Sequence, residues 1–234
     1  MTRDNRRQKK SARKAAKSKR RAAGKAHGVS ARAPEAVRLI SYDITYEPLP
    51  DPTYDRLPQS VKDQLDRLYN ELMAPDPENR LIELQALIEQ YPDVPKIYNF
   101  LYATYDRLND RRNARRVLKE TLKRFPDYLF GRIAYATACL QQGEAEKVPE
   151  IFDNHFGLQL LYPDRRCFHI SEVLGFYSTI AWYFCARGEP DVAKIYYELI
   201  HKLEPDNPRT LLVKDLLRIS RLSSSFKELL ARKS

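Results

Sequence analysis

The sequence predicts an all-α fold built from consecutive helical hairpins, and three observations indicate it. Four Pro-Asp pairs divide the chain at spacings of 34, 37 and 42 residues, and their prolines are Pro92, Pro126, Pro163 and Pro205. Between these pairs, apolar residues recur at the spacing of amphipathic helices. The 234 residues are 43% apolar, which suffices for a sizeable core. Turns that recur near every 34 residues are typical of stacked helix-turn-helix units.

Residues 1–38 differ from the rest in charge and are expected to form a disordered basic tail. They contain 14 Lys and Arg against two acids, whereas residues 39–234 carry a net charge near −2. No Leu, Ile, Val or aromatic residue occurs from Arg3 to Lys25, so this stretch cannot bury a core. Dense, flexible cations bind phosphates without reading sequence, which favours RNA as the partner. The predicted anion-binding residues of the tail are Arg6, Arg7, Lys9, Lys10, Arg13, Lys14, Lys17, Lys19, Arg20, Arg21 and Lys25.

Other interpretations of the tail stay open. The same run of cations is typical of a nuclear-targeting signal, a ribosome-protein-like extension or a solubilising tail. Residue types alone do not separate RNA from DNA or from an acidic protein as the ligand of such a run.

Residues 39–60 are expected to form a proline-rich extended arm. From Ile40 to Tyr46, apolar and polar residues alternate with the period of a strand. Four prolines between Pro48 and Pro58 then prevent a regular element. An all-helical body offers no sheet to join, so we expect the arm to lie along the helices, in the protein's own groove or against another chain.

Residues 61–206 are expected to hold the hairpins, and residues 207–234 a C-terminal capping helix. Two stretches carry a shared pattern with a proline at its end. In the first stretch, which begins at Pro95, the pattern falls on Tyr98, Leu101, Tyr102, Tyr105, Ala114, Leu118, Thr121 and Pro126. In the second, which begins at Leu174, it falls on Tyr177, Ile180, Ala181, Phe184, Ala193, Tyr197, Ile200 and Pro205. This pattern resembles the tetratricopeptide repeat family, which implies an α-solenoid scaffold.

The expected turns within the hairpins support this alignment. Asn109, Gly143 and Gly188 occupy the place where the first helix of each repeat must end, and these residue types tolerate left-handed backbone. The middle repeat is degenerate, and Pro149 is expected to delay or kink its second helix. Eight additional residues before Leu174 are expected to lengthen the next helix by about two turns.

The resemblance implies a concave groove that binds a protein partner. The first helix of each repeat lines this groove in the family. The positions that correspond here, and that we predict to bind a partner, are Lys96, Asn99, Ala103, Asp106, Phe130, Ile133, Thr137, Ser178 and Trp182. Alternatively, these residues are packed inside the protein, for example under the arm from Ile40 to Tyr46.

A second set of cations lies in the first clear repeat. Arg111, Arg115 and Lys119 recur every four residues, which places them on one face of a second helix, and they are predicted to bind an anion or nucleic acid. The competing interpretation is an ordinary solvated helix face. No aromatic residue interleaves with these cations or with the tail, so base stacking is not indicated.

Catalytic, metal and cofactor sites are not predicted. The chain has no glycine-rich phosphate loop, its acids are scattered, and Cys167 and His169 are too isolated to hold a metal. Three sparse cysteines indicate a reducing compartment, and no apolar run is long enough to span a membrane. We therefore expect a protein of the cytoplasm, or of the nucleus if the source is eukaryotic.

These patterns favour a non-enzymatic scaffold or adaptor. It would bind a protein partner, which the sequence does not identify, on its helical repeats, and its tail would tether the assembly to an anionic surface such as RNA. The alternative is a primarily RNA-binding or ribosome-associated protein in which the repeats act as a spacer.

Overall fold

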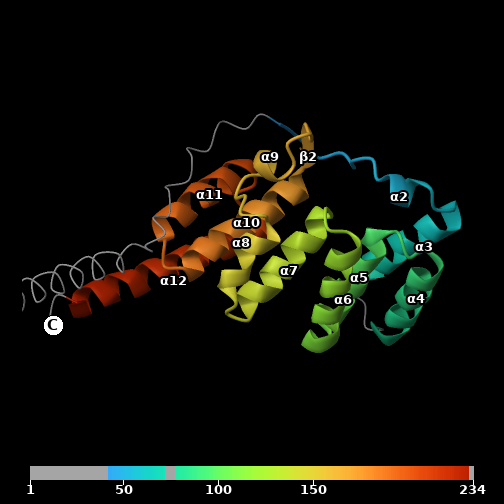
Figure 1. Cartoon of the computed structure of the whole chain (residues 1–234), viewed down its shortest axis with the longest axis horizontal. Helices are drawn as coiled ribbons and strands as arrows, with labels where there is room; N and C mark the ends of the chain where they lie inside the picture. Colours follow the sequence, from blue (N-terminus) through green and yellow to red (C-terminus); the bar gives the residue numbers. More distant parts are fainter. Residues whose placement is uncertain (1–41, 72–76, 232–234) are drawn as a thin grey trace, which may run out of the picture. The chain divides into compact units, whose positions relative to one another are not determined.

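The computed structural model describes residues 42–71 and 77–231, which are mostly helical, as the sequence predicts (Figure 1). The basic tail, residues 1–38, lies outside the described residues. The described chain begins with a short strand and a short helix of the arm. Their bounds are β1 (Asp43–Thr45) and α2 (Pro52–Asp55).

The next four helices pack around one hydrophobic cluster, here called the N-terminal core. Helix α4 packs against α5, and α5 packs against α6. The helices are α3 (Gln59–Asn70), α4 (Pro77–Gln90), α5 (Pro95–Arg107) and α6 (Arg111–Arg124). The most buried residues of the N-terminal core include Leu65, Leu68, Leu84, Ile97 and Tyr98.

The remaining elements surround a second cluster, the C-terminal core. Helix α10 is at its centre and packs against α7, α11 and α12. Its fully buried aromatic residues are Phe152, Phe168 and Phe176. The elements are α7 (Leu129–Gln141), the 3-10 turn η2 (Ala145–Lys147), α8 (Val148–Ile151), α9 (Leu158–Leu161), β2 (Cys167–His169), α10 (Ile170–Ala186), α11 (Pro190–Leu203) and α12 (Pro208–Ala231).

The arm joins a sheet, contrary to the expectation that it had none to join. Strand β1 pairs in parallel with β2, and Ile44 lies opposite Phe168. The Tyr42 ring meets the Phe168 ring edge-on with 4.8 Å between centroids, and its hydroxyl lies 3.1 Å from that of Tyr177. The strand that the alternation predicts is confirmed at Asp43–Thr45. The strand with which it pairs comes from the additional residues before Leu174. Those residues build β2 and only the first turn of α10, not two helical turns.

Beyond β1 the arm reaches the N-terminal core. Leu57 is buried in that core, and the Tyr54 ring packs at its edge. The Lys96 ammonium lies 3.8 Å from the centre of the Tyr54 ring, a cation–π contact. The arm therefore contributes side chains to both cores.

The expected helix ends are confirmed. Asn109, Gly143 and Gly188 have φ angles of 55°, 75° and 74°, in the left-handed region. Proline also interrupts the middle repeat as expected: α8 is a single turn, and left-handed backbone at Asp153 and Asn154 ends it. The chain has therefore left the helix before His155.

Candidate binding site

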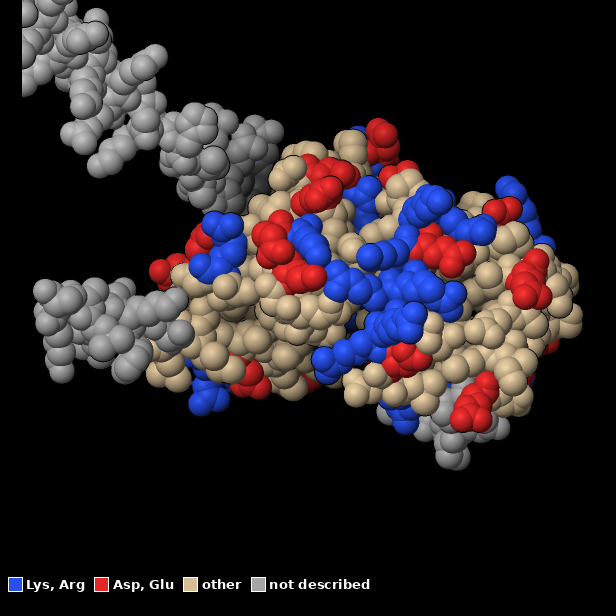
Figure 2. All heavy atoms as spheres, turned by 60° about the horizontal axis from the view of Figure 1, so that its bottom comes forward, with Lys and Arg blue, Asp and Glu red and all other residues tan. Residues whose placement is uncertain are grey.

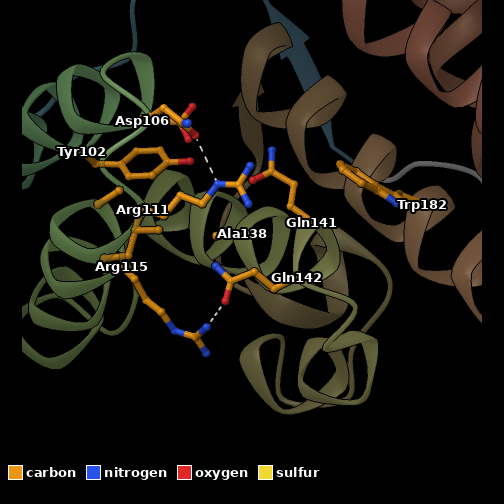
Figure 3. A pocket seen from close by; sticks show the side chains of 11 residues that line it. Tyr102, Asp106, Arg111, Arg115, Ala138, Gln141, Gln142 and Trp182 are labelled. Atoms are coloured by element: carbon orange, nitrogen blue, oxygen red, sulfur yellow. Dashed lines mark hydrogen bonds between the residues drawn. The ribbon is translucent and has the colours of Figure 1, made fainter.

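A surface hollow of about 410 Å³ lies where four helices approach one another. Its size is within the range of small-ligand pockets. Aromatic, amide and charged side chains come to it from α5, α6, α7 and α10 (Figure 3). The aromatic and polar residues that line it are Tyr102, Asp106, Asn109, Arg111, Arg115, Gln141, Gln142 and Trp182.

The turn between α5 and α6 positions the cations of the hollow. After the left-handed Asn109, Asp110 caps α6 by accepting hydrogen bonds from the backbone N–H of Asn113 at 3.0 Å and from its side-chain amide at 2.7 Å. These donors hold the pKa of Asp110 below its ordinary value. Arg111 then begins the helix, and its Nε donates to Asn109 Oδ1 at 3.2 Å.

Two aromatic residues lie on opposite sides of the hollow (Figure 3). Tyr102 comes from α5, and burial raises the pKa of its phenol to about 12, so its hydroxyl remains protonated at neutral pH. Trp182, the only tryptophan of the chain, comes from α10 and is half-buried. Tyr102 was not among the predicted site residues. Its bulk, at a position where the tetratricopeptide family prefers a small residue, was the available signal.

Arg115 is held by partners at one edge of the hollow. Its guanidinium lies 2.6 Å from the Glu144 carboxylate and also donates to the side-chain oxygen of Gln142. Glu144 in turn accepts from Lys147 at 2.8 Å. The charge of Arg115 is therefore matched within the protein, and its main contribution is to join α6 to the segment that follows α7.

The outward face of α6 carries cations that are not matched in this way. Arg112, Arg116, Lys119 and Lys123 are exposed and follow one another at helical spacing, and none forms an ion pair with another described residue. We call these four residues the α6 cationic face. Figure 2 shows Lys and Arg side chains gathered over this region of the surface. Arg111 and Arg115, one turn apart on the same helix, connect this face to the hollow.

The structure brings together only part of the predicted groove. Asp106 and Trp182 both line the hollow, next to the predicted anion-binding residues Arg111 and Arg115. Lys119 lies outside the hollow, on the α6 cationic face. The predicted groove and the predicted row of cations on α6 therefore meet at the hollow.

The other predicted groove residues lie elsewhere. Ile133 and Ser178 are buried, and Ile133 packs so closely on Gly175 that a Cβ there would lie 3.2 Å from its methyl group. Lys96 is half-buried beside Tyr54 of the arm. The remaining half-buried positions are Asn99, Ala103, Phe130 and Thr137.

Cys167 and His169, which the sequence indicated were too isolated to hold a metal, contribute to the fold. Both residues belong to β2, and the His169 ring accepts from the backbone N–H of Ser171, which caps α10. In residues 42–71 and 77–231, no group of three His, Cys, Asp or Glu side chains gathers as metal ligands do. Within the same ranges, every helix is too short or too polar to cross a bilayer.

The chemistry of the hollow suits recognition of a planar polar group next to an anion. The aromatic rings offer stacking surfaces, the amides offer hydrogen bonds, and the nearby cations offer charge. Comparisons with protein-family models and with curated proteins find no match to this chain.

Proposed function

We propose that this protein is a non-enzymatic scaffold that joins RNA to a protein partner. Its helical hairpins form a tetratricopeptide-like solenoid, and its basic tail and the α6 cationic face bind RNA. The observation that carries the proposal is that face: four exposed cations on one side of a regular helix, none of which forms an ion pair with another described residue. Such a surface attracts phosphates through counterion release.

Exposed apolar residues support the protein-binding part of the proposal. On α12, Leu212, Ile219 and Leu222 are 44%, 64% and 73% exposed. Large apolar side chains grouped on a surface are typical of protein contacts. This helix gives the solenoid a surface, separate from the hollow, on which a partner protein binds.

The second candidate is a primarily RNA-binding or ribosome-associated protein in which the helical hairpins act as a spacer. The burial of Ile133 and Ser178 favours it, because it reduces the groove that a tetratricopeptide-like scaffold uses for its partner.

Capture from a lysate of the source cells separates the two candidates. The full-length tagged protein is recovered with its bound RNA and proteins, before and after nuclease treatment. We expect RNA in the untreated sample and at least one protein that remains after nuclease. Loss of every protein with the RNA would favour the spacer function, and absence of RNA from the untreated sample would contradict the tether.

Matched charge reversals test the contribution of α6. Lys119→Glu with Lys123→Glu should lower RNA recovery several-fold, because it reverses half of the α6 cationic face. The control, Lys202→Glu with Lys214→Glu, changes the net charge equally at exposed positions of α11 and α12. Equal recovery with both variants would remove the α6 face from the proposal and leave only the tail.

A further inference from the structure

We propose that the hollow binds an unpaired base of single-stranded RNA while the α6 cationic face binds the adjoining phosphates. This inference rests on the proposed RNA tether and gives it a specific ligand. The basic tail and the cations of α6, as the sequence shows them, suggested only that phosphates are attracted without regard to base sequence. The folded chain adds aromatic residues beside the cations, which the order of residues along the chain does not show.

The aromatic walls of the hollow suit a base. Trp182 and Tyr102 lie on opposite sides of a space of about 410 Å³, and the Trp182 side chain is half-exposed (Figure 3). Aromatic side chains in single-strand-binding proteins stack on bases of any identity, because every base has a π-face. A base that enters the hollow therefore meets a ring without any rearrangement of the backbone.

An unused amide lies between these rings. The Gln141 side chain is exposed at the end of α7 and makes no hydrogen bond with another described residue. The neighbouring Gln142, in contrast, is held by Arg115. One amide offers both a donor and an acceptor, which is what the edge of a base requires.

Cations continue from the hollow along α6. The Arg111 guanidinium projects into the hollow toward Gln141 (Figure 3). Arg112 is the next residue, and Arg116 and Lys119 follow it at intervals of four and three residues, roughly 5–6 Å apart at their Cβ atoms. A strand with one base in the hollow can place its next phosphates along this row.

Two features favour single-stranded RNA over other nucleic acids. Bases in a duplex are stacked and paired, so they cannot enter a side pocket without opening the helix. The Asp106 carboxylate, exposed at the hollow, is an acceptor only, and a ribose 2′-hydroxyl can donate to it. Deoxyribose lacks that donor, and a phosphate would be repelled.

Intrinsic fluorescence provides the test, because Trp182 is the only tryptophan in the chain. The full-length protein is titrated with a ten-nucleotide oligoadenylate, at a salt concentration that screens the phosphate contacts of the tail. We expect saturable quenching of Trp182 by oligoadenylate, and little change with inorganic polyphosphate, which engages the cations but carries no base. The deoxy oligomer and a ten-base-pair RNA duplex should quench less at equal concentration.

Variants measure the contribution of stacking to affinity. With a dye-labelled oligoadenylate, Trp182→Leu should weaken binding roughly 5- to 150-fold, the range of one stacked base. Trp182→Phe keeps a ring and should retain most of the affinity, while both variants should bind polyphosphate as the natural protein does. Circular dichroism checks that both remain folded.

The experiment distinguishes failure of the base-binding hollow from failure of the proposed RNA tether. If the protein binds RNA without quenching, or if polyphosphate or the duplex quenches equally, the base-binding hollow is wrong while the tether stands. Equal quenching by the deoxy oligomer overturns the assignment to RNA. Stronger quenching by an acidic peptide with one phenylalanine assigns the hollow to a protein ligand instead. No RNA binding at all contradicts the proposed function itself.

Discussion

The two cores of this protein leave very different surfaces for binding. Helix α6 covers the N-terminal core with one face and carries seven cations and one acid in its 14 residues. Helix α10 lies within the C-terminal core, and Glu172 is the only charged residue among its 17. A helix that packs on one side must be polar on the other, whereas a helix packed on several sides is apolar all round. Binding groups therefore gather around α6, and α10 contributes only Trp182.

The cores also differ in their main side chains. The fully buried residues of the N-terminal core are mostly aliphatic, whereas Phe152, Phe168 and Phe176 are fully buried in the C-terminal core. The Phe152 and Phe176 rings meet edge-on with 5.0 Å between centroids. Aromatic rings bury more area for each residue, so they help to hold the C-terminal core together where it includes the single-turn helices α8 and α9.

The largest expected effect is on that aromatic cluster. Phe176→Ala should reduce the free energy of unfolding by about 3–5 kcal/mol, because it leaves a cavity among fully buried neighbours. Urea denaturation followed by circular dichroism measures the loss. Leu65→Ala makes the matching cavity in the N-terminal core, with an expected cost of about 2–5 kcal/mol. A cost below about 1 kcal/mol for Phe176→Ala would contradict the central role given to α10.

A smaller effect is expected where the arm is attached to the C-terminal core. Glu172 pairs with Arg165 through both oxygens, at 3.0 and 2.8 Å, and accepts from the backbone N–H of His169 at 3.0 Å. Glu172→Gln should lower the free energy of unfolding by about 1–3 kcal/mol, since these are hydrogen bonds to a charged group. Hydrogen exchange should accelerate at β1 and β2 more than at α5.

Glu198→Gln is the control for this prediction. Glu198 pairs with Lys194 on the exposed surface of α11, and its loss should change stability by less than about 0.5 kcal/mol. Equal acceleration of exchange at α5 and at β2 in the Glu172 variant would show that the two cores open together, which removes the distinction between them.

The smallest effect is expected at the start of α6. The Asn113 side-chain donor lowers the pKa of Asp110, and its backbone N–H and the nearby Arg112 add to the shift. Because the pKa of Asp110 is lower in the folded state than its ordinary value of 3.8, the charged carboxylate stabilises the fold at pH values above 3.8. This stabilisation is lost as the pH falls through the lowered pKa of the folded state.

Asp110→Asn tests this contribution, because asparagine still caps a helix but carries no charge. Thermal melts in a pH series should show a lower midpoint for the variant near neutral pH, and the difference should vanish as pH falls through the lowered pKa of Asp110. Asn113→Ala removes the strongest donor and should shift the loss of stability to higher pH. A midpoint difference that persists undiminished at the acid end would show that charge is not responsible.

Local signals predicted much of the helical part of the fold. Asn109, Gly143 and Gly188 are left-handed, as their residue types suggested, because backbone strain there depends on the residue itself. Pro149 lies in the first turn of α8, which begins only after the 3-10 turn η2, so the expected delay of this helix is also local in origin. The end of α8 was not predicted, because it is set by left-handed backbone at Asp153 and Asn154, which are not glycines.

The candidate site was predicted only in part. Asp106, Trp182, Arg111 and Arg115 were selected by two independent patterns, and the structure places all four at one hollow. Neither the repeat alignment nor the spacing of Arg111, Arg115 and Lys119 indicated that the groove and these cations would meet. The groove was assigned to the first helix of each hairpin and the cations to a second helix. Tyr102 completes the site from a position that had been named only as part of the helical pattern.

The sequence by itself determined the helices, their ends and the concentration of charge on α6, because propensity, capping and amphipathic spacing act over a few residues. Tertiary structure alone decided two features. One is the pairing of β1 with β2, which lie more than 100 residues apart in the chain. The other is the hollow, which needs side chains from four helices. Both depend on packing between distant segments, and no local pattern encodes which distant segments will meet.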